Sequence, residues 1–149
     1  MILMEQKRNE MKMEFLASSS NEGFARVTVG AFVAELNPTV DELADIKTAV
    51  SEAVTNCIIH GYEQKEGSIW IQCATEGQQV EISVVDTGRG IRDIEQAREP
   101  LFTTKPELER SGMGFAFMEA FMDEVEVVSE PGKGTCVTMR KAIGEGQMA

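Results

Sequence analysis

A long helical segment, residues 39–61, constrains the fold of this chain more than any other stretch of its sequence. It opens on Thr39-Val40-Asp41-Glu42, where the threonine can cap the helix and the glutamate three residues later can complete a capping box. Apolar residues then recur at helical spacing: Leu43, Ile46, Val50, Ala53 and Cys57. A helix with one apolar face buries that face against a second layer of structure.

β-rich segments predict that second layer. Residues 68–74 and 80–86 predict one antiparallel hairpin, and residues 125–129 and 135–141 predict another, each pair joined through a glycine-containing turn. Residues 11–17 alternate weakly and predict a further strand. We therefore expect a two-layer α/β sandwich, with a mixed, mostly antiparallel sheet and helices on one face.

Two shorter helices are also predicted. The first follows the capping residues 18–21 and ends at Asn37-Pro38, and a later one covers residues 114–121. In the first helix we expect a buried stripe formed by Phe24, Val27, Ala31 and Leu36. No internal repeat divides the chain, so we expect a single domain at residues 9–143 with flexible termini at 1–8 and 144–149.

Composition narrows the function classes. The 149 residues carry a net charge of −11, which opposes binding to nucleic acid and favours a basic protein partner. Three scattered cysteines, Cys57, Cys73 and Cys136, form neither a disulfide framework nor a zinc motif and fit a reduced, cytoplasmic compartment. No apolar run approaches the length of a membrane span, so we expect no membrane association.

Two polar motifs stand out within this scaffold. Glu52 and Asn56 lie four residues apart on the long helix, so their side chains project from one face ~5–6 Å apart. Asp86 ends an apolar strand, and Gly88 and Gly90 follow it, which allows the backbone to turn tightly and approach a ligand. Together the motifs predict a nucleotide site.

Simpler interpretations exist for each residue of these motifs. Glu52 can be an exposed helix charge, and Asp86 can merely close its own turn, since aspartate commonly bonds backbone two residues on. His60, on the same helix face as Asn56, can be a packing or helix-end residue.

Three further segments follow in a known order: Thr103-Thr104-Lys105, then Arg110 to Phe115, then Gly132-Lys133-Gly134-Thr135. With them the chain resembles the GHKL superfamily of ATPases and kinases. Residues 46–62 and 100–123 are similar to the anti-sigma F factors of sporulating bacteria, which are serine kinases. The resemblance covers nearly the whole chain and implies ATP or ADP and Mg²⁺ as cofactors.

The resemblance implies a role for each motif. Glu52 would be the general base for a hydroxyl nucleophile, and Asn56 would be an oxygen ligand of Mg²⁺. Asp86 would accept the exocyclic amine of adenine, directly and through water shared with Gly90 and Thr135, whereas guanine presents an acceptor there.

The phosphates are expected to meet the stretch from Thr103 to Phe115. Gly112 and Gly114 would free backbone amides where a helix begins, and a helix N-terminus favours anions. Arg110 is expected to stabilise the transferred phosphoryl group from a lid. The remaining expected contacts are Thr103, Thr104, Lys105, Ser111, Met113 and Phe115.

Three functions remain open at this point. The chain resembles a serine kinase that sequesters a sporulation sigma factor and phosphorylates its anti-anti-sigma antagonist. It is also similar to stress-response anti-sigma kinases, and a nucleotide-gated binding module without kinase activity is the third possibility. The resemblance further implies a homodimer built on the first helix and strand, and partner binding by Glu22 and Arg26 on that helix.

Overall fold

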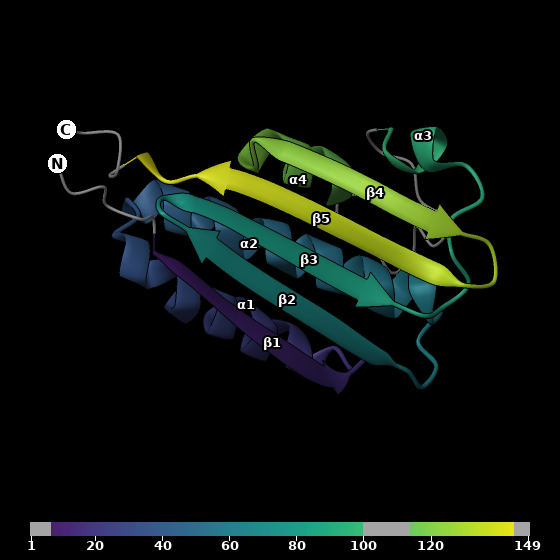
Figure 1. The fold of residues 1–149 in the computed structure, drawn as a ribbon. Helices are drawn as coiled ribbons and strands as arrows, with labels where there is room; N and C mark the ends of the chain where they lie inside the picture. The colour runs from purple at the N-terminus through teal and green to yellow at the C-terminus, as the bar shows by residue number, and fades with distance from the viewer. Residues whose placement is uncertain (1–6, 100–113, 145–149) are drawn as a thin grey trace, which may run out of the picture.

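The structure is a computed structural model that describes residues 7–99 and 114–144 of the chain. Five antiparallel strands form one sheet in the order β1-β2-β3-β5-β4, and helices cover one of its faces (Figure 1). The strands are β1 (Arg8–Leu16), β2 (Ser68–Glu76), β3 (Gln79–Asp86), β4 (Glu124–Glu130) and β5 (Gly134–Ala142). The predicted two-layer sandwich is confirmed, and all four described strand pairings are antiparallel rather than mixed.

The helices follow the predicted order. They are α1 (Ser20–Val33) with the 3₁₀ turn η1 (Ala34–Leu36), α2 (Val40–Asn56) with the π-helical turn η2 (Cys57–Gly61), α3 (Ile94–Ala97) and α4 (Gly114–Phe121). The short α3 was not predicted, because a four-residue helix carries no sustained apolar period. None of the helices in the described residues is long and apolar enough to cross a membrane.

The capping box at the start of α2 forms as predicted. Thr39 Oγ1 accepts the Glu42 amide at 3.0 Å, and Glu42 Oε1 accepts the Thr39 amide at 2.9 Å. The other carboxylate oxygen of Glu42 accepts the amide of Gly144 at 2.6 Å, so the same side chain ties the end of the described chain to α2. These backbone hydrogen bonds lower the pKa of Glu42.

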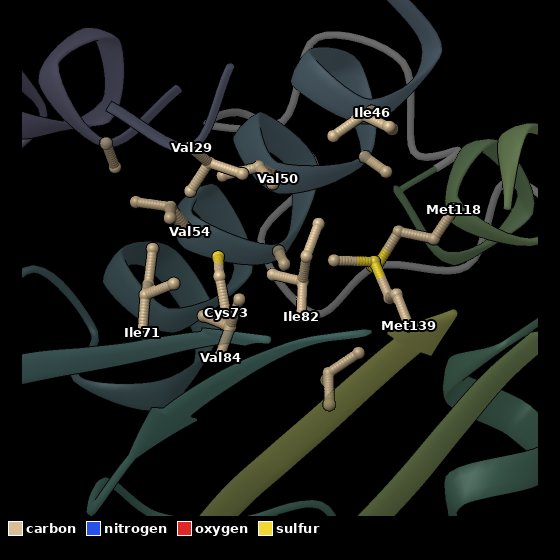
Figure 2. Close-up of a cluster of buried hydrophobic side chains, with 14 of the residues drawn as sticks. Val29, Ile46, Val50, Val54, Ile71, Cys73, Ile82, Val84, Met118 and Met139 are labelled. Atoms are coloured by element: carbon tan, nitrogen blue, oxygen red, sulfur yellow. The ribbon is translucent and has the colours of Figure 1, made fainter. Parts of the chain in front are cut away.

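The core lies between the helices and the inner face of the sheet. Figure 2 shows Val50 and Val54 of α2 directed toward Ile71 and Ile82 of the sheet. These four side chains are almost completely buried. Met118 of α4 meets Met139 of β5 at the far side of the same cluster, so α2 and α4 share one apolar layer (Figure 2).

The predicted buried stripe of the first helix is wrong at three of its four residues, and only Leu36 is partly buried against the core. Phe24 and Val27 are 58% and 59% exposed, and Ala31 is exposed as well. The buried residues are the smaller Ala25, Val29, Gly30 and Val33. A β-carbon on Gly30 would lie 2.9 Å from Lys47 Cε, so α1 packs closely on α2 at this position. Spacing alone favoured the larger residues and therefore selected the wrong face.

The Glu42→Gln substitution tests the capping network. We expect it to lower the free energy of unfolding by about 1 kcal/mol at neutral pH, because a neutral amide accepts the backbone amides of Thr39 and Gly144 more weakly. The pKa of Glu42 is lowered by folding, so its contribution is present above the unfolded pKa and is lost as pH falls through the folded pKa. The measurement is urea unfolding from neutral to acid pH.

Asp41→Asn, in the same first turn of α2, is the matched control for this experiment. A difference from wild type that stayed constant into strong acid would contradict the role assigned to the Glu42 carboxylate.

Candidate functional site

A cavity of about 710 Å³ opens at one end of the sheet, beside the C-terminal end of α2. Its walls come from α2 and η2, the turn after β3, α3, the first residues of α4, and the β4–β5 turn with β5. The volume is typical of small-molecule sites. Apolar side chains line part of it: Val84 and Val137 from paired strands of the sheet, Ile91 from the segment after β3 and Phe115 from α4.

The fold brings together six of the predicted site residues in this cavity: Asn56, Asp86, Gly90, Gly114, Phe115 and Thr135. Glu52 and Gly88 do not line it, but they pack against the lining residues Gly114 and Gly61. The expected contacts Thr103, Thr104, Lys105, Arg110, Ser111, Gly112 and Met113 lie outside the described residues. Glu22 and Arg26 lie on α1 and are not part of the cavity.

Gly114, the first residue of α4, packs directly against the two polar residues of α2. A β-carbon on Gly114 would lie 3.2 Å from both side-chain amide atoms of Asn56 and 3.4 Å from Glu52 Oε2. The backbone of α4 therefore approaches the carboxylate and the carboxamide closely. The start of a helix carries unpaired amides that favour anions, so this end of the cavity suits phosphate groups.

Asp86 also lines the cavity, and only 4% of its surface is exposed. Its Oδ1 accepts the amide of Gly88 at 2.9 Å. Burial raises the pKa of the Asp86 carboxyl, while hydrogen bonds from the Gly88 amide, the Cys57 thiol and the Thr135 backbone oppose that shift. Burial, followed by the neighbouring Asp86 charge, raises the pKa of Cys57, so the thiol is protonated and serves as the donor.

Glycines allow the turn after Asp86 to pack onto its neighbours. A β-carbon on Gly88 would lie 2.1 Å from the carbonyl oxygen of Gly61, at the end of η2. Gly90 adopts a φ of 75°, and a β-carbon there would lie 2.2 Å from the Glu130 carbonyl oxygen. The Asp86–Gly90 segment is therefore wedged between the end of α2 and the β4–β5 turn.

Sequence reasoning missed several residues of the cavity. His60 lines the cavity, although the sequence did not decide between a packing and a functional role for it. Cys57, Arg92 and Gln96 line the cavity as well. The spacing of Glu52, Asn56 and His60 along one helix face contained the information for His60. Arg92 and Gln96 lie in the charged segment from Arg92 to Ser111, which the sequence predicts to be a lid, but no spacing singled out either residue.

Comparisons with known proteins agree with this geometry. Residues 17–141 match the family described as the histidine kinase-like ATPase domain. An anti-sigma F factor of Thermoanaerobacter sp. strain X514 is 61% identical over 136 residues, which cover 91% of this chain and 95% of that protein. The chain belongs to the anti-sigma F factor family within the histidine kinase-like ATPases.

Another family member is equally similar to this chain. The anti-sigma F factor of Halalkalibacterium halodurans is 61% identical over 135 residues, covering 90% of this chain and 92% of the relative. Matches of this length place Glu52, Asn56 and Asp86 inside the shared domain. The resemblance to the GHKL superfamily is thereby confirmed.

Solved structures support the same fold. The RsbU and RsbW domains of a Mycobacterium tuberculosis protein match with a TM-score of 0.66 and 25% identity, over 91% of this chain and 32% of that chain. A blue-light activated histidine kinase of Erythrobacter litoralis matches with a TM-score of 0.57 and 18% identity, over 84% of this chain and 43% of that chain. The second match concerns the fold alone.

Replacing Asp86 by Asn tests the electrostatics of the buried carboxylate. We expect Asp86→Asn to increase the free energy of unfolding of the nucleotide-free protein at neutral pH, because the folded state disfavours the charged form. The folded pKa is raised, so this gain shrinks as pH falls through it and vanishes below the unfolded pKa. We also expect weaker ATP binding and less discrimination against GTP.

Thermal unfolding from neutral to acid pH and calorimetry with both nucleotides measure these effects, with Asp41→Asn as control. If the affinities for ATP and GTP were unchanged, Asp86 would have only a structural role, in the turn that follows β3.

Proposed function

We propose that this chain is an ATP-dependent serine kinase and anti-sigma factor that sequesters a sporulation sigma factor and phosphorylates its anti-anti-sigma antagonist. The observation that carries the proposal is the contact of Glu52 and Asn56 with the start of α4, beside a cavity that Asp86 also lines. The carboxylate proposed to bind the nucleobase and the helix start proposed to bind the phosphates then belong to one site. The anti-sigma F names of the relatives support the biological role.

In the proposed reaction the target serine oxygen attacks the γ-phosphorus of ATP. The bond from that phosphorus to the oxygen bridging to ADP breaks, and the serine proton passes to the Glu52 carboxylate. Mg²⁺, when bound through Asn56 and the phosphates, would neutralise phosphate charge. Asp86 would hold the adenine, and Arg110 remains a predicted phosphoryl-stabilising residue.

The Glu52→Gln substitution tests the kinase assignment. We expect it to slow phosphorylation by about 10²–10⁴-fold while ATP affinity changes little, because a general base acts on the nucleophile rather than on the bound nucleotide. The measurement combines transfer of labelled phosphate to an anti-anti-sigma protein with calorimetry of ATP binding.

Asp45→Asn removes a carboxylate two turns earlier on the same helix and serves as control for Glu52. An undiminished transfer rate in Glu52→Gln would show the base assignment to be wrong. Nucleotide-dependent sigma-factor binding by the wild type, without serine phosphorylation, would favour the binding-module alternative. Phosphorylation confined to a stress-response antagonist would favour the other kinase class.

We propose α1 as the partner-binding surface. Glu22 and Arg26 form an ion pair, with Arg26 Nε 3.6 Å from Glu22 Oε1, and their side chains are 29% and 43% exposed. Arg26 Nε is shielded from solvent and makes no hydrogen bond within the described residues. The exposed Phe24 and Val27 lie on the same helix. A guanidinium with remaining donors beside exposed apolar groups suits a partner carboxylate within an apolar contact.

A homodimer through α1 and β1 also remains our proposal. β1 is an edge strand of the sheet, and Leu16 at its end is 69% exposed. An unpaired edge and exposed apolar groups favour association with another chain.

The Arg26→Glu substitution tests the partner surface. We expect it to weaken binding of the sigma factor or of the anti-anti-sigma protein by about tenfold, because it replaces the guanidinium by a charge that repels Glu22 and any partner carboxylate. ATP affinity should stay unchanged, since α1 does not border the cavity. Pull-downs in ATP and in ADP, with the exposed Lys65→Glu as control, measure the effect. If Arg26→Glu bound both partners as tightly as the wild type does, the proposed partner surface would be wrong.

A further inference from the structure

Tyr62 follows directly after the π-helical turn at the end of α2 and does not line the cavity. Its hydroxyl lies 2.5 Å from the carbonyl oxygen of Ser68, 2.8 Å from the amide nitrogen of Thr87 and 3.2 Å from Thr87 Oγ1. A tyrosine hydroxyl has one proton, and a carbonyl only accepts. The proton therefore goes to Ser68, and both the amide and the hydroxyl of Thr87 donate to Tyr62.

This hydroxyl sits where the β2–β3 ladder stops. The last paired residues are Ile69 of β2 and Asp86 of β3, so Ser68 and Thr87 are the next residues along the two strands. The Tyr62 oxygen bridges the Ser68 carbonyl and the Thr87 amide at the position of the next rung. The two strands separate there, and the chain leaves the sheet immediately after Asp86.

The end of α2 also binds the other side of the turn that follows β3. The amide of Arg89 donates to the carbonyl of Gly61 at 2.9 Å, and the amide of Gly88 donates to Asp86 Oδ1 at 2.9 Å. Gly61 and Tyr62 thus bind the backbone at both ends of the Thr87–Arg89 segment. The direction of the Asp86 carboxylate depends on that backbone.

We propose that Tyr62 is a positioning residue that sets nucleobase recognition, by fixing where β3 leaves the sheet and so how Asp86 meets the base. The inference rests on the proposed function, in which Asp86 reads the amine of adenine. Without the hydroxyl, the Thr87 amide is left unbonded or pairs directly with the Ser68 carbonyl. Either result moves the residue next to Asp86.

A second residue controls the same ring from a different element. A β-carbon on Gly67 would lie 2.5 Å from both Cδ1 and Cε1 of Tyr62. Gly67 does not line the cavity, its backbone is not in the left-handed region, and the three atoms nearest to the added β-carbon all belong to the Tyr62 ring, so alanine there acts on that ring. Gly67→Ala should therefore displace the hydroxyl without removing it and reproduce the effect of Tyr62→Phe.

The experiment compares ATP with inosine triphosphate, which carries an oxygen in place of the amine. Calorimetry is performed on wild type, Tyr62→Phe, Gly67→Ala and the control Gly23→Ala, where the added methyl meets Arg26 at an ordinary 3.5 Å. We expect ATP affinity to fall about tenfold in both test variants and inosine triphosphate affinity to change much less. The preference for ATP over inosine triphosphate then shrinks in both test variants, whereas Gly23→Ala retains the wild-type preference.

A general loss of stability would lower both affinities by the same factor, and that result would overturn the proposal. An unchanged preference for ATP in both test variants would overturn it too. A wild-type protein without any preference for ATP would instead contradict the proposed reading of adenine by Asp86, and this inference with it.

Discussion

The structure depends on the burial of one face of α2 against the inner face of the sheet. Ile46, Val50 and Val54 are fully buried there, and the capping box defines where the helix begins. Once that face is fixed, the helical period aims Glu52, Asn56 and His60 to another side. Burial of the apolar face of α2 thereby sets the direction of the polar side chains on its other side.

The end of α2 joins this scaffold to the part of the cavity that Asp86 lines. Glycines at 61 and 88 let two backbone segments touch, and the Tyr62 hydroxyl occupies the place of a ladder rung beside them. The buried Asp86 carboxylate is held by the same contacts, although its burial disfavours its charge. A buried carboxylate of this kind lowers the stability of the fold slightly and remains available to bind a ligand. This trade-off between stability and binding is common at binding sites.

The limits of sequence reasoning appear at particular residues. The capping box, the two hairpins and the Asp86 turn were predicted because each depends on neighbours within a few positions. The buried face of α1 was predicted wrongly, because the spacing of the larger apolar residues selected Phe24 and Val27, whereas the helix packs through the smaller Ala25, Val29, Gly30 and Val33. The cavity residues of α3 were missed, since nothing local links them to α2.

The sequence by itself determined helices α1, α2 and α4, the hairpins and the identity of Glu52, Asn56 and Asp86 as candidate site residues, because local periodicity and turn chemistry encode them. Only the tertiary structure decided the strand order, in which β5 inserts between β3 and β4. That order places Thr135 opposite Asp86 and brings the β4–β5 turn onto Gly90. Pairing between distant strands depends on how whole layers pack, and no short stretch of sequence contains that information.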